Sequence, residues 1–296
     1  MYQKWLCFLC LISFDLFAAE ANIYDLQYLP DAGMLYGHTD ATYTSGEAKN
    51  TNTVAIYGWT YAQTIGWAPT DKFLLSARIR NTALTYEYFT GSKAQFTGWS
   101  DPSLEGRYRI LNENFILDFI GGGILSTDSS YINFGGTANA HGSNDADFLG
   151  GPQVFMGLEI GQKREYWQYA FQAFGYRVMN STSRFKGEPT QSNDPYNIWT
   201  LQGSLLNNLN SQKLFLHSFI GTRLVDGYLA KASESNEKFA IAPIIEYRMG
   251  TGLDYALSPS FLWNTGVTYR EFKFDSGSIK YYYMLVWDVG LKYQFQ

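Results

Sequence analysis

The chain has 296 residues, of which 18% are aromatic and only 17% charged, and its formal net charge is −5. This composition is aromatic-rich and charge-poor for a soluble protein, yet the mean hydropathy of −0.21 excludes a bundle of membrane helices. A β-barrel reconciles the two facts, because only one face of each strand meets lipid. The acidic balance also argues against nucleic-acid binding.

The first 21 residues have the pattern of a signal peptide. Lys4 supplies a positive charge, Trp5–Leu16 is mostly apolar, and small residues flank a cleavage site after Ala21. Both cysteines, Cys7 and Cys10, fall inside this segment, so we expect a mature chain without disulfides or thiolate metal sites. The remaining chain has 21 basic and 25 acidic residues, a net charge of −4.

Downstream of residue 21, no apolar run approaches the roughly 20 residues of a membrane-spanning helix. A membrane protein without such helices satisfies its backbone polar groups in a closed barrel. We therefore predict residues 22–33 to be a short periplasmic lead-in and 34–296 to be an outer-membrane β-barrel domain.

Runs of alternating apolar and polar residues predict about twelve strands. In chain order they cover 34–45, 53–67, 73–86, 101–111, 114–126, 147–161, 165–179, 197–207, 213–226, 238–255, 261–275 and 281–295. Pro243 falls inside one run and indicates a bulge or an early strand residue. The glycines Gly121–Gly123 lack the strand–turn–helix context of a phosphate loop, and we expect them to relieve crowding in a curved strand.

The connections between these runs alternate in length. The short ones are 68–72, 112–113, 162–164, 208–212 and 257–260, and the long ones are 46–52, 87–100, 127–146, 180–196, 227–237 and 276–280. Short periplasmic turns alternate with long outer loops when an antiparallel up-and-down barrel has an even number of strands and both termini in the periplasm. The loop lengths therefore predict this all-β, transmembrane fold class.

The last run, Tyr281–Phe295, shows the alternation most clearly. All its odd positions are apolar or aromatic, whereas its even positions turn polar towards the C-terminus. Such a strand presents one face to lipid. The predicted lipid-facing aromatic girdle consists of Tyr281, Tyr283, Trp287, Tyr293 and Phe295.

The opposite faces of the strands are charged, and we expect them to line the lumen. The candidate pore-lining residues are Arg78, Arg80, Glu105, Arg107, Arg109, Asp118, Glu159, Arg223, Glu246, Arg248, Asp288 and Lys292. The first four arginines lie on adjacent predicted strands, where a basic ladder would steer anionic solutes. The alternative is that arginines and carboxylates pair across a narrow lumen and fill it, because about twelve strands is intermediate between packed and water-filled barrels.

One short motif suggests an enzyme. His141-Gly142-Ser143-Asn144 resembles the His-x-Ser-Asn motif of outer-membrane phospholipases and lipid-A deacylases, which implies His141 as general base and Ser143 as nucleophile. The motif falls in a Gly/Asn/Asp-rich loop, and the sequence shows no third member. We therefore predict no catalytic residues, and, since no metal-ligand spacing occurs, no metal site and no cofactor.

The segment Gly98–Arg109 reads Gly-Trp-Ser-Asp-Pro-Ser-Leu-Glu-Gly-Arg-Tyr-Arg. It is similar to the Gly-x-x-Asp-x-x-Leu-x-x-Lys-Tyr-Arg strand of outer-membrane β-barrel transporters associated with the meta-pathway of phenol degradation, with Arg107 in place of the usual Lys. The resemblance covers residues 98–178 and includes Ile120–Asp128 and Asp145–Gly157. It implies a transporter-like barrel. The C-terminal residues Tyr-Gln-Phe-Gln resemble the aromatic signal read by barrel-assembly machinery, with Phe295 penultimate.

These patterns favour a passive, porin-like channel for small solutes in the bacterial outer membrane. The alternatives are a non-conducting structural or adhesive barrel that works through its outer loops, and a lipid hydrolase that uses His141 and Ser143. The expected partners are outer-membrane lipid, the barrel-assembly machinery during biogenesis and small solutes, and not nucleic acid. The sequence leaves the solute and a homo-oligomer open.

Overall fold

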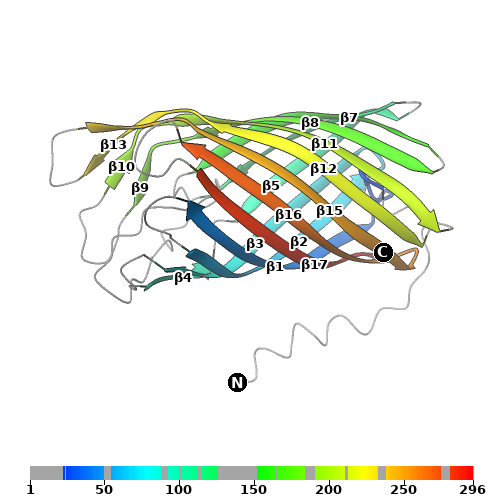
Figure 1. Ribbon diagram of the computed structural model, residues 1–296. Helices are drawn as coiled ribbons and strands as arrows, with labels where there is room; N and C mark the ends of the chain where they lie inside the picture. The colour runs from blue at the N-terminus through cyan, green and yellow to red at the C-terminus, as the bar shows by residue number, and fades with distance from the viewer. Residues whose placement is uncertain are drawn as a thin grey trace, which may run out of the picture.

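The structure is a computed structural model that describes residue 23 and residues 25–49, 55–87, 93–99, 102–112, 115–125, 152–164, 166–183, 191–210, 213–232, 238–274 and 281–295. Every regular element in these ranges is a β-strand (Figure 1). Within them, no helix is long and apolar enough to cross a membrane. The predicted signal peptide and the His141/Ser143 motif lie outside the described residues.

Twelve antiparallel strands close into a barrel, which confirms the predicted fold class. Each strand pairs with the next barrel strand along the chain, and the first, β1 (Leu35–Lys49), pairs with the last, β17 (Tyr281–Phe295). The strands between them are β2 (Ala55–Thr70), β3 (Phe73–Glu87), β5 (Ser103–Asn112), β6 (Ile116–Ile124), β7 (Gln153–Lys163), β8 (Trp167–Val178), β11 (Tyr196–Asn210), β12 (Leu214–Val225), β15 (Ile244–Ser258) and β16 (Phe261–Phe274).

The two ends of the barrel differ in their connections. Short turns join β2 to β3, β5 to β6, β7 to β8, β11 to β12 and β15 to β16, all at the end where β1 begins and β17 ends. We call this the turn end, and it lies on the right in Figure 1. The longer connections lie at the opposite loop end, so the predicted alternation of short and long links is confirmed.

Several strands at the loop end lie where the sequence predicted loops. β4 (Lys93–Trp99) pairs with the outer half of β3. A separate four-stranded sheet consists of β9 (Ser181–Ser183), β10 (Gln191–Asn193), β13 (Tyr228–Ala232) and β14 (Lys238–Ile241) (Figure 1). The single strand predicted over 238–255 is therefore wrong: it is β14 and β15, separated at residues 242–243. Pro243 explains the break, since it has no N–H to continue the ladder.

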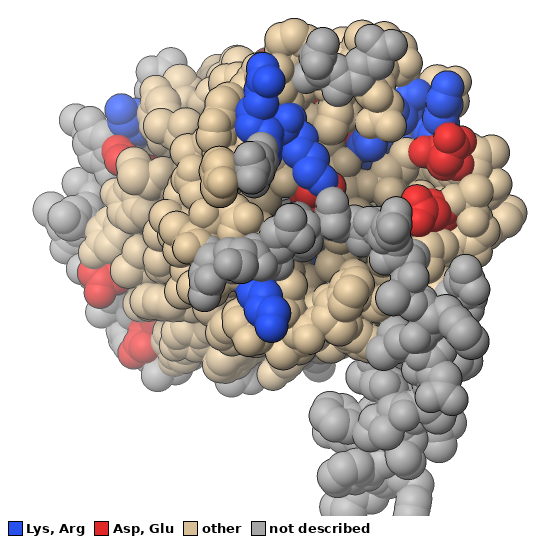
Figure 2. All heavy atoms as spheres, turned by 90° about the vertical axis from the view of Figure 1, so that its right-hand side faces the viewer, with Lys and Arg blue, Asp and Glu red and all other residues tan. Residues whose placement is uncertain are grey.

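The outer face of the barrel is apolar. In β7, Val154, Met156, Leu158 and Ile160 are exposed, while the residues between them face inwards. Aromatic rings gather near the ends of the strands, as where Trp167 and Tyr169 stack with ring centroids 5.5 Å apart. Figure 2 looks onto the turn end and shows charged side chains around the mouth beside a mostly uncharged flank. An apolar exterior of this kind suits contact with lipid.

The predicted girdle residues of β17 lie on this outer face. Trp287 is 42% exposed, and Tyr283, Tyr293 and Phe295 are half-buried on the same side of the strand. The side chain of Tyr281 lies outside the described part of the structure. Tyr293 stacks on Phe261 of the neighbouring strand and on Phe295, with centroids 6.4 and 6.0 Å apart.

Leu158 tests the membrane-facing assignment, because it lies midway along β7 and is 49% exposed. We predict that Leu158→Arg lowers the free energy of unfolding by about 2–4 kcal/mol, since the charge would lie near the bilayer midplane. Urea titration of the protein folded into lipid vesicles measures this loss. Leu257→Arg is the matched control: Leu257 is exposed at the turn end, where the cost should be only about 0–1 kcal/mol. Equal losses would contradict the assignment.

Candidate functional site: the barrel interior

Inward-facing side chains form rows around the barrel, because paired residues on neighbouring strands point to the same face. One row, on β5 to β8, consists of Arg109, Asp118, Glu159 and Gln172. Another, on β17, β1, β2, β3 and β5, consists of Lys292, His38, Thr64, Arg78 and Ser103. The register therefore gathers polar residues that lie far apart in the sequence.

The row near the turn end is a buried ionic network. Arg109 Nε lies 2.8 Å from Asp118 Oδ1, and Arg107 contacts Asp118 at 3.3 Å and Glu159 at 3.1 Å. Gln172 donates a further hydrogen bond to Glu159 at 2.9 Å. The side chains of Asp118 and Glu159 have no exposed area. Charges buried this deeply are tolerated only because each has a partner.

Two further groups of ion pairs occupy the interior. Arg78 on β3 lies 3.2 Å from Asp40 on β1. On β12, β15 and β16, Glu246 lies between Arg223 at 3.5 Å and Arg270 at 2.6 Å. Much of the interior charge is thus paired, as in the second of the two alternatives that the sequence leaves open.

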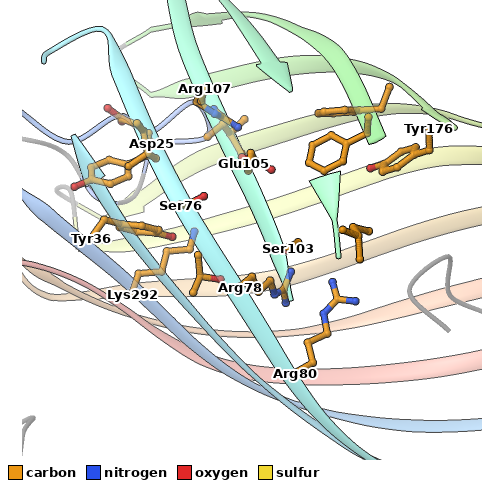
Figure 3. Close-up of a pocket in the computed structure, with 17 residues that line it drawn as sticks. Asp25, Tyr36, Ser76, Arg78, Arg80, Ser103, Glu105, Arg107, Tyr176 and Lys292 are labelled. Carbon is orange, nitrogen blue, oxygen red and sulfur yellow. The ribbon is translucent and has the colours of Figure 1, made fainter. Parts of the chain in front are cut away.

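A cavity of about 380 Å³ lies inside the barrel, above the turn end (Figure 3). Its lining includes the cationic side chains of Arg78, Arg80, Arg107 and Lys292 and the carboxylates of Asp25 and Glu105. On its other side the lining is apolar and aromatic, and comprises Ile124, Phe155, Phe174 and Tyr176 on β6 to β8. One wall of the cavity is therefore mainly charged, with Tyr28 and Tyr36 also in the lining, and the other wall is apolar and aromatic.

Glycines under the aromatic wall make room for its rings. A Cβ added at Gly122 would lie 2.7 Å from the ring of Phe155, and one at Gly157 would lie 2.4 Å from the ring of Phe174. Both rings thus lie across glycines of the preceding strand, where any larger residue would displace them. The expectation that Gly121–Gly123 relieve crowding agrees with these close contacts.

The N-terminal segment crosses the mouth at the turn end. We call Asp25–Met34 the strap. Gln27 donates to the Glu159 carbonyl at 3.3 Å and accepts a bond at its own carbonyl from Arg109 at 2.5 Å. On the far side, the Tyr28 hydroxyl donates to Gln294 on β17. Since β7 and β17 lie on opposite sides of a twelve-stranded barrel, the strap bridges the opening and floors the cavity.

Further contacts anchor the two ends of the strap. Asp25 accepts bonds from Lys163 and Gln168, both at 2.7 Å. Gly33 has φ +86°, a left-handed conformation that favours glycine, and its N–H donates to the Ala68 carbonyl at 2.6 Å. Burial, together with Tyr36 and the carboxylates Asp31 and Asp25, raises the pKa of Tyr28, so its hydroxyl remains a donor.

The predicted pore-lining residues divide into two groups. Arg78, Arg80, Glu105, Arg107 and Lys292 line the cavity. The other predicted residues lie on barrel strands with buried or half-buried side chains but do not line the cavity. They are Arg109, Asp118, Glu159, Arg223, Glu246, Arg248 and Asp288. The expected single basic ladder is wrong, because Arg78 lies opposite Ser103 whereas Arg107 lies opposite Leu74, four residues along the strand.

Sequence reasoning missed Asp40 and the strap. Asp40 follows His38 on the inward face of the first strand, so its parity could have revealed it. Asp25, Gln27 and Tyr28 belong to no alternating run, and the sequence gives no signal for them. Among the described residues, no group of three or more His, Cys, Asp or Glu side chains is placed to hold a metal ion.

No protein-family model and no curated protein sequence matches this chain. Among solved structures, it is similar to an outer-membrane channel from Pseudomonas putida F1, with TM-score 0.60 and 10% identity over 96% of this chain and 100% of that one. The chain is also similar to the transport unit of the autotransporter AIDA-I from Escherichia coli, with TM-score 0.52 and 11% identity over 92% of this chain and 93% of that one. For the NanC porin the TM-score is 0.50, with 8% identity over 86% of this chain and 98% of that one.

The fold and its likenesses define the class of this protein: it is an outer-membrane-type β-barrel of twelve strands. At such low identity the likeness shows the fold alone, and it includes both channels and an autotransporter unit. The resemblance to the transporters associated with phenol degradation stays a prediction.

Proposed function

We propose that this protein is a passive channel for small solutes in the bacterial outer membrane, with no catalytic role. The observation that carries the proposal is the charged cavity inside the barrel, which is floored by a strap and not by the barrel wall. A peptide segment can move aside, whereas a barrel filled by its own wall residues has no such path. The fold-level likeness to a Pseudomonas channel and to NanC supports the same class.

The proposed orientation places the turn end in the periplasm, after removal of a signal peptide at residues 1–21. Short turns and both chain ends lie on the periplasmic side of barrels with an even number of strands. The loop end then faces the cell exterior. Protease added to intact cells should cleave the long connections there and leave the turns intact.

Planar bilayers test the channel directly. We expect the purified, folded protein to give stepwise conductance, and Lys292→Glu to shift the anion-to-cation permeability ratio towards cations by roughly twofold or more, because it reverses a charge on the cavity wall. The reversal potential under a salt gradient measures the ratio. Arg177→Glu, on the outer face of β8, is the control and should leave the ratio unchanged. A folded protein that never conducts would contradict the proposal.

A second candidate function is a non-conducting barrel that works through its loop end. The four-stranded sheet of β9, β10, β13 and β14 favours it, because that sheet extends the protein beyond the barrel strands. The bilayer measurement separates the two functions. Replacing residues 181–193 by a short turn should leave conductance intact under the channel proposal, whereas a loop-based function would be lost.

A further inference from the structure

We propose that the cavity is a binding site for small aromatic carboxylates. The inference rests on the proposed function in one respect, since it names the solute class that the channel would favour. Binding itself requires only the two walls of the cavity, one cationic and one aromatic (Figure 3).

Lys292 and Arg78 supply the carboxylate-binding wall. They stand on one row of the barrel, separated by β1 and β2, and both side chains line the cavity (Figure 3). Lys292 forms no ion pair with any residue that the structure describes. Asp40 contacts Arg78 only through Nη2, at 3.2 and 3.5 Å, and the Arg78 Nε has no acceptor there. A guanidinium has donors for a second carboxylate beyond the one that Asp40 occupies.

The charge balance of the lining favours an anion. Four cationic side chains, Arg78, Arg80, Arg107 and Lys292, line the cavity. Arg78 is paired with Asp40, and Arg107 with Asp118 and Glu159, whereas Lys292 has no ion-pair partner among the described residues. In a site of low polarity the Lys292 charge attracts an anion more strongly than in water.

The opposite wall is suited to an aromatic ring. Tyr176 contacts the rings of Phe155 and Phe174, with centroids 5.3 and 6.2 Å apart. Aromatic rings pack on one another in offset or tilted geometries at such distances and gain free energy beyond the area they bury. The volume of about 380 Å³ falls within the range of roughly 300–1,000 Å³ that small-molecule sites occupy.

Only a ligand with both features uses both walls. A short aliphatic carboxylate would leave the rings of Phe155 and Phe174 uncovered. A neutral aromatic molecule would leave Lys292 without a carboxylate partner, and burying that charge unpaired is unfavourable. The geometry therefore discriminates by charge and by ring together.

Calorimetric titration of the full-length protein in detergent tests the site without requiring transport. The probes are benzoate, its neutral analogue benzamide, acetate and cyclohexanecarboxylate. We expect benzoate to bind at least about tenfold more tightly than benzamide or acetate, and several-fold more tightly than cyclohexanecarboxylate. Equal affinities for benzoate and benzamide, or no benzoate binding by folded protein, would overturn the proposal.

Two variants assign the walls. Lys292→Gln should weaken benzoate binding about tenfold, since it removes one charged partner, and leave benzamide unaffected. Lys213→Gln, the same substitution at an exposed lysine of the turn end, is the control. Phe174→Leu should weaken benzoate without affecting acetate, and it keeps the test valid if the Lys292 variant fails to fold. A Lys292→Gln protein that folds and binds benzoate like wild type contradicts the site.

The binding experiment tests the proposed site and the conductance experiment tests the proposed channel, so one proposal can be contradicted while the other stands. Benzoate binding by a barrel that never conducts would support the site and overturn the channel. Conductance with no preference for benzoate in binding would support the channel and overturn the site.

Discussion

Deleting residues 23–30 is expected to raise the single-channel conductance of the barrel by about twofold or more, because the strap then no longer bridges the mouth. Its contacts reach opposite sides of the barrel: Gln27 to Glu159 and Arg109 on one side, and Tyr28 to Gln294 on the other. The barrel strands themselves begin at Leu35, so the deletion removes none of their pairing. Recordings in planar bilayers from protein refolded in detergent measure the change.

A milder change and a control support that measurement. Tyr28→Phe removes only the hydroxyl that reaches Gln294, so we expect more frequent openings with an unchanged fully open level. Asp31→Asn alters an exposed residue of the same strap and should behave like wild type. Conductance of the deletion protein equal to that of wild type would show that the strap does not obstruct the path.

The exterior of the barrel could be predicted well because lipid imposes a strict requirement on it. Every second side chain of a barrel strand, Leu158 among them, faces lipid and must be apolar. A period of two can be recognised in a single sequence. The predicted strands 73–86 and 281–295 therefore match β3 and β17 within a residue. Beyond the membrane the requirement ends. β9, β10 and β13 are short strands held only by pairing with their neighbours, so their sequences show no alternation of apolar and polar residues.

For the interior, the sequence predicts which side chains face inwards but not which of them pair with one another. The parity of Arg107 and Asp118 places both inward, and the structure agrees. Their partners depend on the register between strands, which a single sequence does not fix: Arg107 reaches Glu159, two strands away. The strap escaped prediction for a different reason. The Gln27 side-chain amide donates to the Glu159 carbonyl and the Gln27 carbonyl accepts from Arg109, and single contacts of this kind leave no periodic pattern in the sequence.

Asp118→Ala is expected to be the most destabilising single change in the interior, lowering the free energy of unfolding by about 3–5 kcal/mol. Asp118 is fully buried and accepts from both Arg107, at 3.3 Å, and Arg109, at 2.8 and 3.0 Å. Its removal leaves one guanidinium without its carboxylate and the other with Glu159 alone. Urea unfolding in micelles measures the loss. Asp31→Ala, at an exposed position, should cost less than about 0.5 kcal/mol.

The same substitution should also loosen the strap, because Arg109 holds both Asp118 and the Gln27 carbonyl. Without the carboxylate, the Arg109 side chain loses the contact that fixes its direction, so Asp118→Ala should raise conductance as well. If the two changes act through one contact, Asp118→Ala adds nothing to the conductance of the protein that lacks residues 23–30. Additive increases would mean that Asp118 affects the path independently of the strap.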